Sequence, residues 1–321
     1  MKKNLLGCIS RKTLFIDIFI FSVTTGSLLA EMPVLTDVRA EGMGEAYTAV
    51  ADQSTALDWN PAGLGTMQRT DLTALYSQSL VDTQYTNFSY GHPCSFGGIA
   101  VGWSRVSNDF EKTSAQDQSL GTGSVSNDVV MAGFGYNGLP VALGMTVRYF
   151  SERIDPELLS GYAFDLGALY TYKQCRFGWV WKNVLSSSLE GTGIAGNNVS
   201  EVVPPIMRAG FAWVLPVDFD VRDLGNGSND QLQKSEIWHF TLTSALDVDI
   251  PVYSQQVLAI SPGLEIGVRD LIAIRLGLSQ LQDFRVGLSI KTKIVSFDYA
   301  FLFNPSLTNT QMLSTSLYFG T

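Results

Sequence analysis

The residues of this chain that could support acid–base or ligand chemistry are few and widely spaced. Its two histidines are His92 and His239, and no Gly-x-Ser-x-Gly element accompanies either one. A serine hydrolase needs a nucleophile held beside a base, so the sequence does not predict an enzyme or a catalytic residue. The histidines and cysteines also lack the spacing of a metal site. We therefore predict no metal ligand and no cofactor.

Charged residues also recur inside segments that are otherwise apolar. They face one side of these segments, and both signs of charge are interleaved among them: Arg148, Asp165, Lys182, His239, Glu265, Arg275, Arg285 and Asp298. Opposite charges in this arrangement can form ion pairs and hydrogen-bond networks, which would be a structural role. The alternative is that these side chains line a pathway for a solute.

The segments that carry these charges alternate in the manner of β-strands. Near the C-terminus, Ile272, Ile274, Leu276 and Leu278 alternate with Ala273, Arg275, Gly277 and Ser279, and the same period continues through 284–291 and 297–303. Successive residues of a strand face opposite sides of a sheet. The pattern therefore predicts a sheet with one apolar face and one charged face.

The composition favours a membrane-spanning form of this sheet. Charged residues make up 16% of the chain and hydrophobic residues 45%, whereas soluble domains average about 25% charged residues. Beyond the N-terminus no apolar run reaches the roughly 18 residues of a membrane-spanning helix. Because lipid tolerates no unpaired backbone groups, a closed β-barrel is the spanning design that remains. A soluble periplasmic β-sandwich is the alternative.

Turn signals divide residues 71–319 into about fourteen strand candidates, an even number of the kind bacterial barrels use. We expect polar loops at 107–124 and 185–204 on the outer side, and tight turns at 137–140, 173–175 and 291–293 on the periplasmic side. The stretch 216–235 does not fit, because the strand count places this long segment on the periplasmic side. An aromatic girdle is predicted from Tyr162, Tyr170, Tyr172, Trp179, Trp181 and Tyr318.

The N-terminus has the composition of an export signal. Basic residues precede an apolar stretch over 14–23, and small residues end at Ala30. We expect residues 1–30 to be a cleaved secretory signal peptide. A lipoprotein cleavage box at Leu5-Leu6-Gly7-Cys8 is a less favoured interpretation. Cys94 and Cys175 then remain, either as a disulfide or as two unpaired thiols. The net charge of −9 argues against nucleic acid as a partner.

Residues 31–68 do not alternate and are rich in glycine and alanine, which predicts a compact arrangement of short helix and turns. The segment contains Gly42-Met43-Gly44-Glu45-Ala46-Tyr47 and, downstream, Asn60-Pro61-Ala62-Gly63-Leu64. This pairing, just before a run of strands, resembles the FadL-type long-chain fatty acid transporter superfamily, including its PorV and PorQ relatives. Strand segments such as Phe164–Tyr170, Trp181–Val184 and Phe297–Phe301 are similar to that wider group.

The resemblance implies an all-β transmembrane antiparallel barrel of about 14 strands over residues 69–321, with residues 31–68 folded into its lumen as a hatch. The residues that match the hatch motif are Gly42, Gly44, Ala46, Tyr47, Asn60, Pro61, Ala62 and Gly63. The implied location is the bacterial outer membrane, in contact with its lipid.

The implied function is passive uptake of long-chain fatty acids or similar hydrophobic molecules. Burial of each methylene favours an apolar pocket by about 0.8 kcal/mol, and Arg148, Arg275 and Arg285 are the candidates to hold a carboxylate. The chain is shorter than typical fatty acid transporters. The alternative, from the PorV and PorQ side, is a barrel that serves protein secretion or surface attachment, with an exported protein as its partner.

Overall fold

The computed structural model describes residues 37–78, 83–113, 119–154, 157–192, 198–220, 237–252, 257–303 and 309–320. All of them belong to one compact unit, Pro33–Thr321. The predicted signal peptide, its cleavage after Ala30 and the Leu5–Cys8 box lie outside the described residues.

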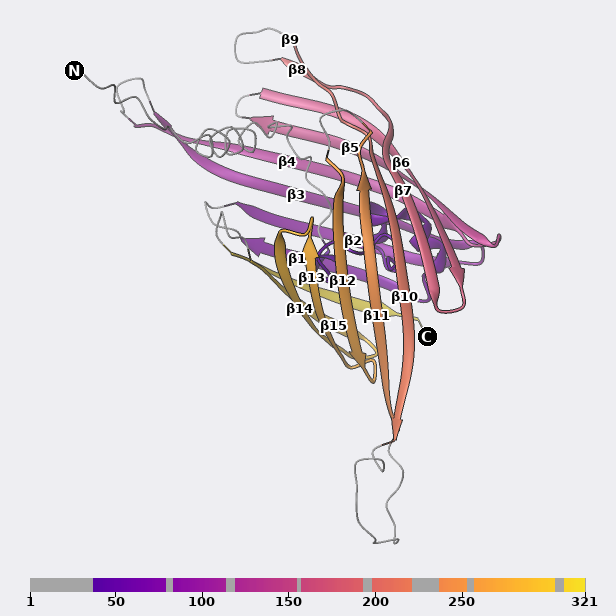
Figure 1. The fold of residues 1–321 in the computed structure, drawn as a ribbon. Helices are drawn as coiled ribbons and strands as arrows, with labels where there is room; N and C mark the ends of the chain where they lie inside the picture. Colours follow the sequence, from indigo (N-terminus) through magenta and orange to yellow (C-terminus); the bar gives the residue numbers. More distant parts are fainter. Residues whose placement is uncertain are drawn as a thin grey trace, which may run out of the picture. The chain divides into compact units, whose positions relative to one another are not determined.

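The described chain forms sixteen strands, of which fourteen close a ring. The strands are β1 Thr70–Gln78, β2 Gln84–Cys94, β3 Gly97–Thr113, β4 Ser119–Tyr136, β5 Val141–Ile154, β6 Glu157–Tyr172, β7 Cys175–Ser186, β8 Leu189–Thr192, β9 Asn198–Glu201, β10 Ile206–Asp220, β11 Ile237–Ile250, β12 Ala259–Val268, β13 Ile272–Ser279, β14 Asp283–Lys291, β15 Val295–Leu302 and β16 Thr310–Phe319. Neighbours pair antiparallel in chain order, except that β7 pairs with β10, and β1 pairs with β16 to close the ring (Figure 1). The predicted fourteen-stranded barrel is confirmed.

Side chains alternate between the two sides of the barrel wall as the sequence predicts. In β13 the side chains of Ile272, Ile274 and Leu276 are 38%, 47% and 42% exposed, whereas Ala273 and Arg275 are buried. The outside is therefore apolar and the inside carries the charges, as expected where the surrounding medium is hydrocarbon. Among the described helices, none is long and apolar enough to cross a membrane.

The polar stretch predicted as a loop at 107–124 is mostly strand. β3 continues to Thr113 and β4 begins at Ser119, with Ser107–Lys112 paired to Gly121–Ser126. A hairpin extends by backbone hydrogen bonds alone, so it needs no apolar face once it leaves the hydrocarbon layer. The other predicted loop, 185–204, contains the short strands β8 and β9; β8 pairs with β6, and β9 pairs with β8.

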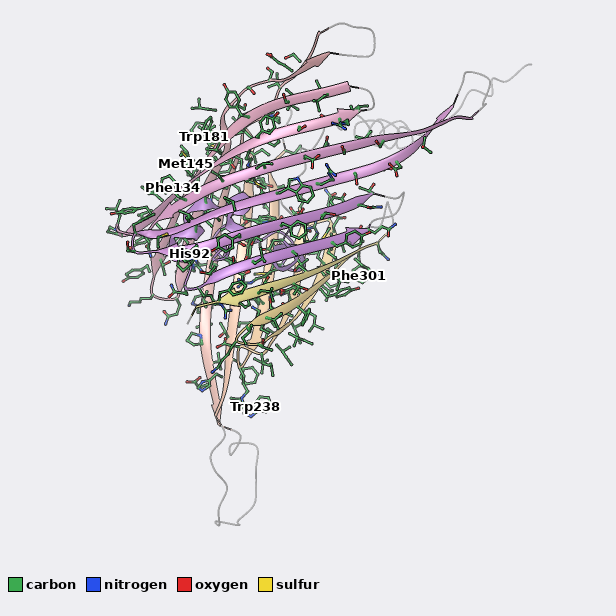
Figure 2. All side chains as sticks on the ribbon, turned by 180° about the vertical axis from the view of Figure 1, so that it is seen from behind. His92, Phe134, Met145, Trp181, Trp238 and Phe301 are labelled. Carbon is green, nitrogen blue, oxygen red and sulfur yellow. The ribbon has the colours of Figure 1, made fainter. Side chains whose placement is uncertain are left out.

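The strands β10 and β11 extend beyond their neighbours. Pairing of β10 with β7 ends at Trp213, whereas its pairing with β11 continues to Asp220. Trp238 lies near the end of this extension (Figure 2). The segment predicted as a loop at 216–235 therefore begins as strand, and residues 221–236 lie outside the described ranges. Strand order places the β10–β11 connection at the same end as the tight turns, an end we call the short-turn end.

Residues 37–67, which we call the lumen segment, fill the inside of the ring. The segment contains α2 Val38–Gly42, α3 Ala56–Trp59 and the 3-10 helix η1 Pro61–Thr66, drawn in indigo in Figure 1. Its apolar side chains are almost all fully buried, and the rings of Tyr47 and Trp59 meet edge to face with centroids 5.9 Å apart. The lumen segment therefore packs closely against the inward face of the wall.

Candidate functional site

The candidate functional site is the contact between the lumen segment and the barrel wall, and capping residues shape the segment locally. Asp37 begins α2, and its carboxylate accepts a hydrogen bond of 2.7 Å from the backbone N–H of Arg39. Asn60 begins η1, where its Oδ1 accepts from the N–H of Ala62 at 3.1 Å, and Pro61 occupies the first helical position. Asp and Asn are favoured helix caps, and proline suits the first turn because no N–H is needed there.

The Asn60-Pro61-Ala62 turn also binds the wall directly. Asn60 Nδ2 donates to the carbonyl of Thr48, at 2.9 Å, and to the carbonyl of Ala168 in β6, at 3.1 Å. One amide side chain therefore joins two parts of the lumen segment to a strand. Asn60 and Ala62 are both 0% exposed.

The helix η1 packs against a row of glycines that crosses four strands; we call this row the seat of η1. Gly98, Gly135, Gly144 and Gly167 are successive cross-strand partners in β3, β4, β5 and β6. A Cβ added at these positions would come within 2.1–2.3 Å of atoms of the lumen segment. Because no other residue lets two backbones approach so closely, the row determines where η1 can lie.

Two further glycine pairs seat the earlier part of the segment. Gly178 and Gly210 are partners in β7 and β10 and lie against Thr48, while Gly263 and Gly277 are partners in β12 and β13 and lie against Met43. Gly44 itself has φ of +64°, a conformation that side chains disfavour. These glycine contacts were not predicted from the sequence. Their signal was glycine at inward positions of the alternating strands.

Carboxylates of the wall accept hydrogen bonds from the backbone of the lumen segment. Asp247 Oδ2 accepts from the N–H groups of Tyr47 and Thr48 at 3.0 and 2.9 Å, and Asp71 accepts from the N–H of Ser54. Neither aspartate was singled out from the sequence, although both occupy inward positions. The three donors lie between α2 and α3, so these carboxylates bind the backbone of the lumen segment outside its helices.

Ion pairs form a second class of link, and the first group surrounds Asp58 of α3. Arg148 approaches Asp58 at 2.7 Å, outside hydrogen-bond geometry, and Asp165 at 2.5 Å. Lys182 reaches the other oxygen of Asp58 at 3.2 Å. The side chain of Asp58 is fully buried, so this carboxylate depends on the two cations of the wall.

The strand ladder is interrupted beside this group. Between the pairs Phe164–Leu185 and Leu166–Trp181, residue Asp165 of β6 faces three residues of β7. Asn183 has φ of +54°, and its N–H donates to Asp165 at 2.8 Å. The bulge therefore lets Asp165 bind the wall backbone and Arg148 at once.

The second group of ion pairs lies across the barrel. Arg285 of β14 pairs with Glu41 and, at 2.8 Å, with Glu45. Arg39 pairs with Glu265 at 2.9 Å and with Asp52 at 2.9 Å. Burial lowers the pKa of Arg39, but the carboxylates of Glu265 and Asp52 outweigh it and hold that pKa well above its ordinary value. Burial also raises the pKa of Asp37.

The three arginines predicted to hold a substrate carboxylate are all inward, buried and paired with protein carboxylates. Arg148 binds Asp165, Arg285 binds Glu41, and Arg275 binds Glu265 at 2.5 Å. The sequence left two roles open for the interleaved charges, ion pairing within the protein or lining a pathway for a solute. In the structure these three arginines form ion pairs within the protein. An arginine of this set could hold a ligand only after its present pair opens.

Several other sequence expectations can be located. The side chains of Tyr162, Tyr170, Tyr172 and Trp179 face outward and are 37–55% exposed. Tyr318 was wrongly assigned to the girdle. It faces inward, is 5% exposed and hydrogen bonds to Ser296.

The remaining candidates for chemistry are separate from one another. Cys94 and Cys175 are both free, so the pairing that the sequence left open is absent. His239 lies on the β10–β11 extension, where it pairs with Asp218 in an exposed position. Within the described ranges no group of three or more His, Cys, Asp or Glu side chains is arranged to hold a metal ion.

Comparisons with known proteins give a structural likeness only. No protein-family model matches the sequence, and no curated protein matches it. The Ralstonia pickettii toluene transporter TbuX is similar in structure, with a TM-score of 0.52 at 12% identity, over 92% of this chain and 100% of that one. The Pseudomonas putida toluene transporter TodX is similar, with a TM-score of 0.52 at 11% identity, over 89% of this chain and 98% of that one. At these identities the likeness is one of fold.

Proposed function

We propose that this protein is an outer-membrane barrel for the passive uptake of hydrophobic molecules, with the lumen segment as its gate. The observation that supports this most directly is a lumen filled by a segment that rests on glycines and is held by polar contacts. The apolar outside of the barrel suits a lipid environment. The fold that this chain has in common with two toluene transporters supports the same class of cargo.

The contacts of the lumen segment are of a kind that can be released. Ion pairs and hydrogen bonds to Asp58, Glu41 and Tyr47 exchange for contacts with water when the segment moves. The glycine row presents no side chains that interlock with η1. Displacement of the segment would open a path by breaking these polar contacts and the small apolar clusters that Val38 and Ala62 form with the wall.

We propose long-chain fatty acids or similar hydrophobic molecules as the cargo. An acyl chain gains about 0.8 kcal/mol for each methylene that leaves water, so few polar contacts are needed for capture. If the cargo is an acid, its carboxylate would compete with Asp165, Glu265 or Glu41 for Arg148, Arg275 or Arg285. Such competition would couple binding to release of the segment.

The test combines bound-ligand analysis with uptake. The protein is purified from its native membrane in mild detergent, and bound molecules are identified by mass spectrometry against a detergent control. Uptake of labelled fatty acid and of toluene is measured in a bacterial host that lacks its own transporter. Enriched hydrophobic ligand and protein-dependent uptake of either probe support the proposal. A stoichiometric polypeptide with no uptake would instead favour a role in protein export.

A further inference from the structure

A cavity of about 240 Å³ lies at the short-turn end of the barrel, between the lumen segment and the wall. Arg39, Val50 and Asp52 of the lumen segment line one side of it. The other side is formed by the ends of several strands, among them β7 through Arg176 and β14 through Lys291. Both of these cations point inward, one residue past the start of β7 and at the last residue of β14.

Arg176 and Lys291 differ from the other inward cations because neither has an ion-pair partner within the described ranges. Arg148, Arg275 and Arg285 each have a carboxylate partner. Each of these three arginines also has one buried nitrogen without an acceptor, but the buried Nε of Arg176 lacks an acceptor on a side chain that has no ion pair within those ranges. This Nε has lost its contact with water without gaining an acceptor, which is costly for a charged group.

The carboxylates that line the same cavity do not form ion pairs with Arg176 or Lys291. Glu265 is bound by Arg39 through both carboxylate oxygens and by Arg275 through one of them. Asp52 is held by Arg39. Asp270 also lines the cavity, but it is exposed in the turn between β12 and β13. The cavity therefore combines two cations that lack an anion with acids that are already bound or solvated.

The neutral residues of the cavity define the shape of a ligand. Thr241 and Thr243 present hydroxyl groups, and Val50, Val214 and Ala273 present apolar surface. We propose that this cavity binds a small amphipathic organic acid, with its carboxylate on Arg176 and Lys291 and its hydrocarbon part against the apolar residues. Carboxylates form charge-assisted hydrogen bonds with both kinds of cation. The inference goes beyond the proposed uptake, since the site can be filled from the solution at this end of the barrel.

Binding of 4-fluorobenzoate to the detergent-solubilised full chain, followed by fluorine NMR, tests the proposal. The neutral isostere 4-fluorobenzamide is the matched probe. Arg176→Gln and Lys291→Gln should each weaken binding of the acid by about tenfold or more, because each removes a charge-assisted hydrogen bond. Arg105→Gln should leave it unchanged, since Arg105 pairs with Asp128 away from the cavity. Heat-shifted gel mobility confirms that each variant is folded, and Arg176→Lys should restore part of the affinity.

The proposal is overturned if the acid does not bind, if the amide binds equally well, or if both Gln variants retain wild-type affinity. A second arm identifies where the ligand enters. With Ser54 and Ser89, whose hydroxyl oxygens are 2.7 Å apart, both replaced by cysteine and oxidised, the lumen segment is joined to β2. Retained binding then supports entry from the short-turn end, and lost binding supports entry through the barrel. Neither result of this arm depends on uptake.

Discussion

The contribution of Asp58 to holding the lumen segment can be tested by Asp58→Asn. This side chain is fully buried and lies 2.7 Å from Arg148 and 3.2 Å from Lys182. Removing one partner of a buried ion pair costs about 3–5 kcal/mol. We expect the lower end, about 3 kcal/mol, because Arg148 keeps its pair with Asp165. Opening of the segment from the wall should then become about 100-fold more frequent.

Hydrogen exchange followed by mass spectrometry measures this opening residue by residue. In Asp58→Asn the amides of Asn60 and Gly63, which are bonded to Ala56 and Asn60, should exchange about 100-fold faster. Amides in the wall strands should be unchanged. The control is Asp128→Asn, which breaks the half-exposed pair with Arg105 and should cost about 1 kcal/mol or less. Equal exchange in both variants would refute the reasoning, as would faster exchange throughout the wall.

Two further variants test the seat of η1. Gly144→Ala would place a Cβ 2.1 Å from the carbonyl carbon of Pro61 and should expose the lumen segment to limited proteolysis. The control Gly267→Ala meets nothing closer than 3.8 Å and should behave as wild type. Identical proteolysis of the two variants would contradict close packing of η1 on the glycines. Asn60→Ala removes the cap of η1 and the bond to Ala168, which should cost about 2 kcal/mol or more in chemical unfolding and alter uptake; unchanged uptake in this variant would count against a gate at this turn.

The architecture could be predicted from local pattern because inward and outward side chains alternate at every residue along the strands of a barrel wall. Residues 272–291 alternate so regularly that strand, face and turn all follow from the sequence, and the strand count agrees with the structure. The pattern fails where the wall leaves the apolar layer. Ser107–Lys112 contain one apolar residue, Phe110, so the alternation is lost and the sequence predicts a loop, although these residues pair with β4. The assignment of Tyr318 to the girdle was wrong for a different reason, because an aromatic side chain at a strand end can face either side of the wall.

The candidate site was predicted only in part, because its contacts join residues far apart in the chain. Asn60-Pro61-Ala62 could be found by its motif, but its glycine seat in β5 and β6 could not, since register decides which glycines align. Arg285 and Glu41 are 244 residues apart, and nothing local indicates that they pair. Most of the charged residues predicted to share one face take part in the ion-pair network, but His239 is exposed on the β10–β11 extension. Which acid each arginine holds depends on closure of the ring.

The most direct measurement of a gating lumen segment is uptake with that segment locked. Ser54 and Ser89 are replaced by cysteine to join the segment to β2, and the native cysteines are replaced by serine. The matched control joins Thr73 to Ser316, whose hydroxyl oxygens are 2.8 Å apart within the wall. We predict that oxidation stops uptake only in the Ser54→Cys/Ser89→Cys protein and that a reductant restores it. Full uptake through the oxidised, locked protein would contradict the account.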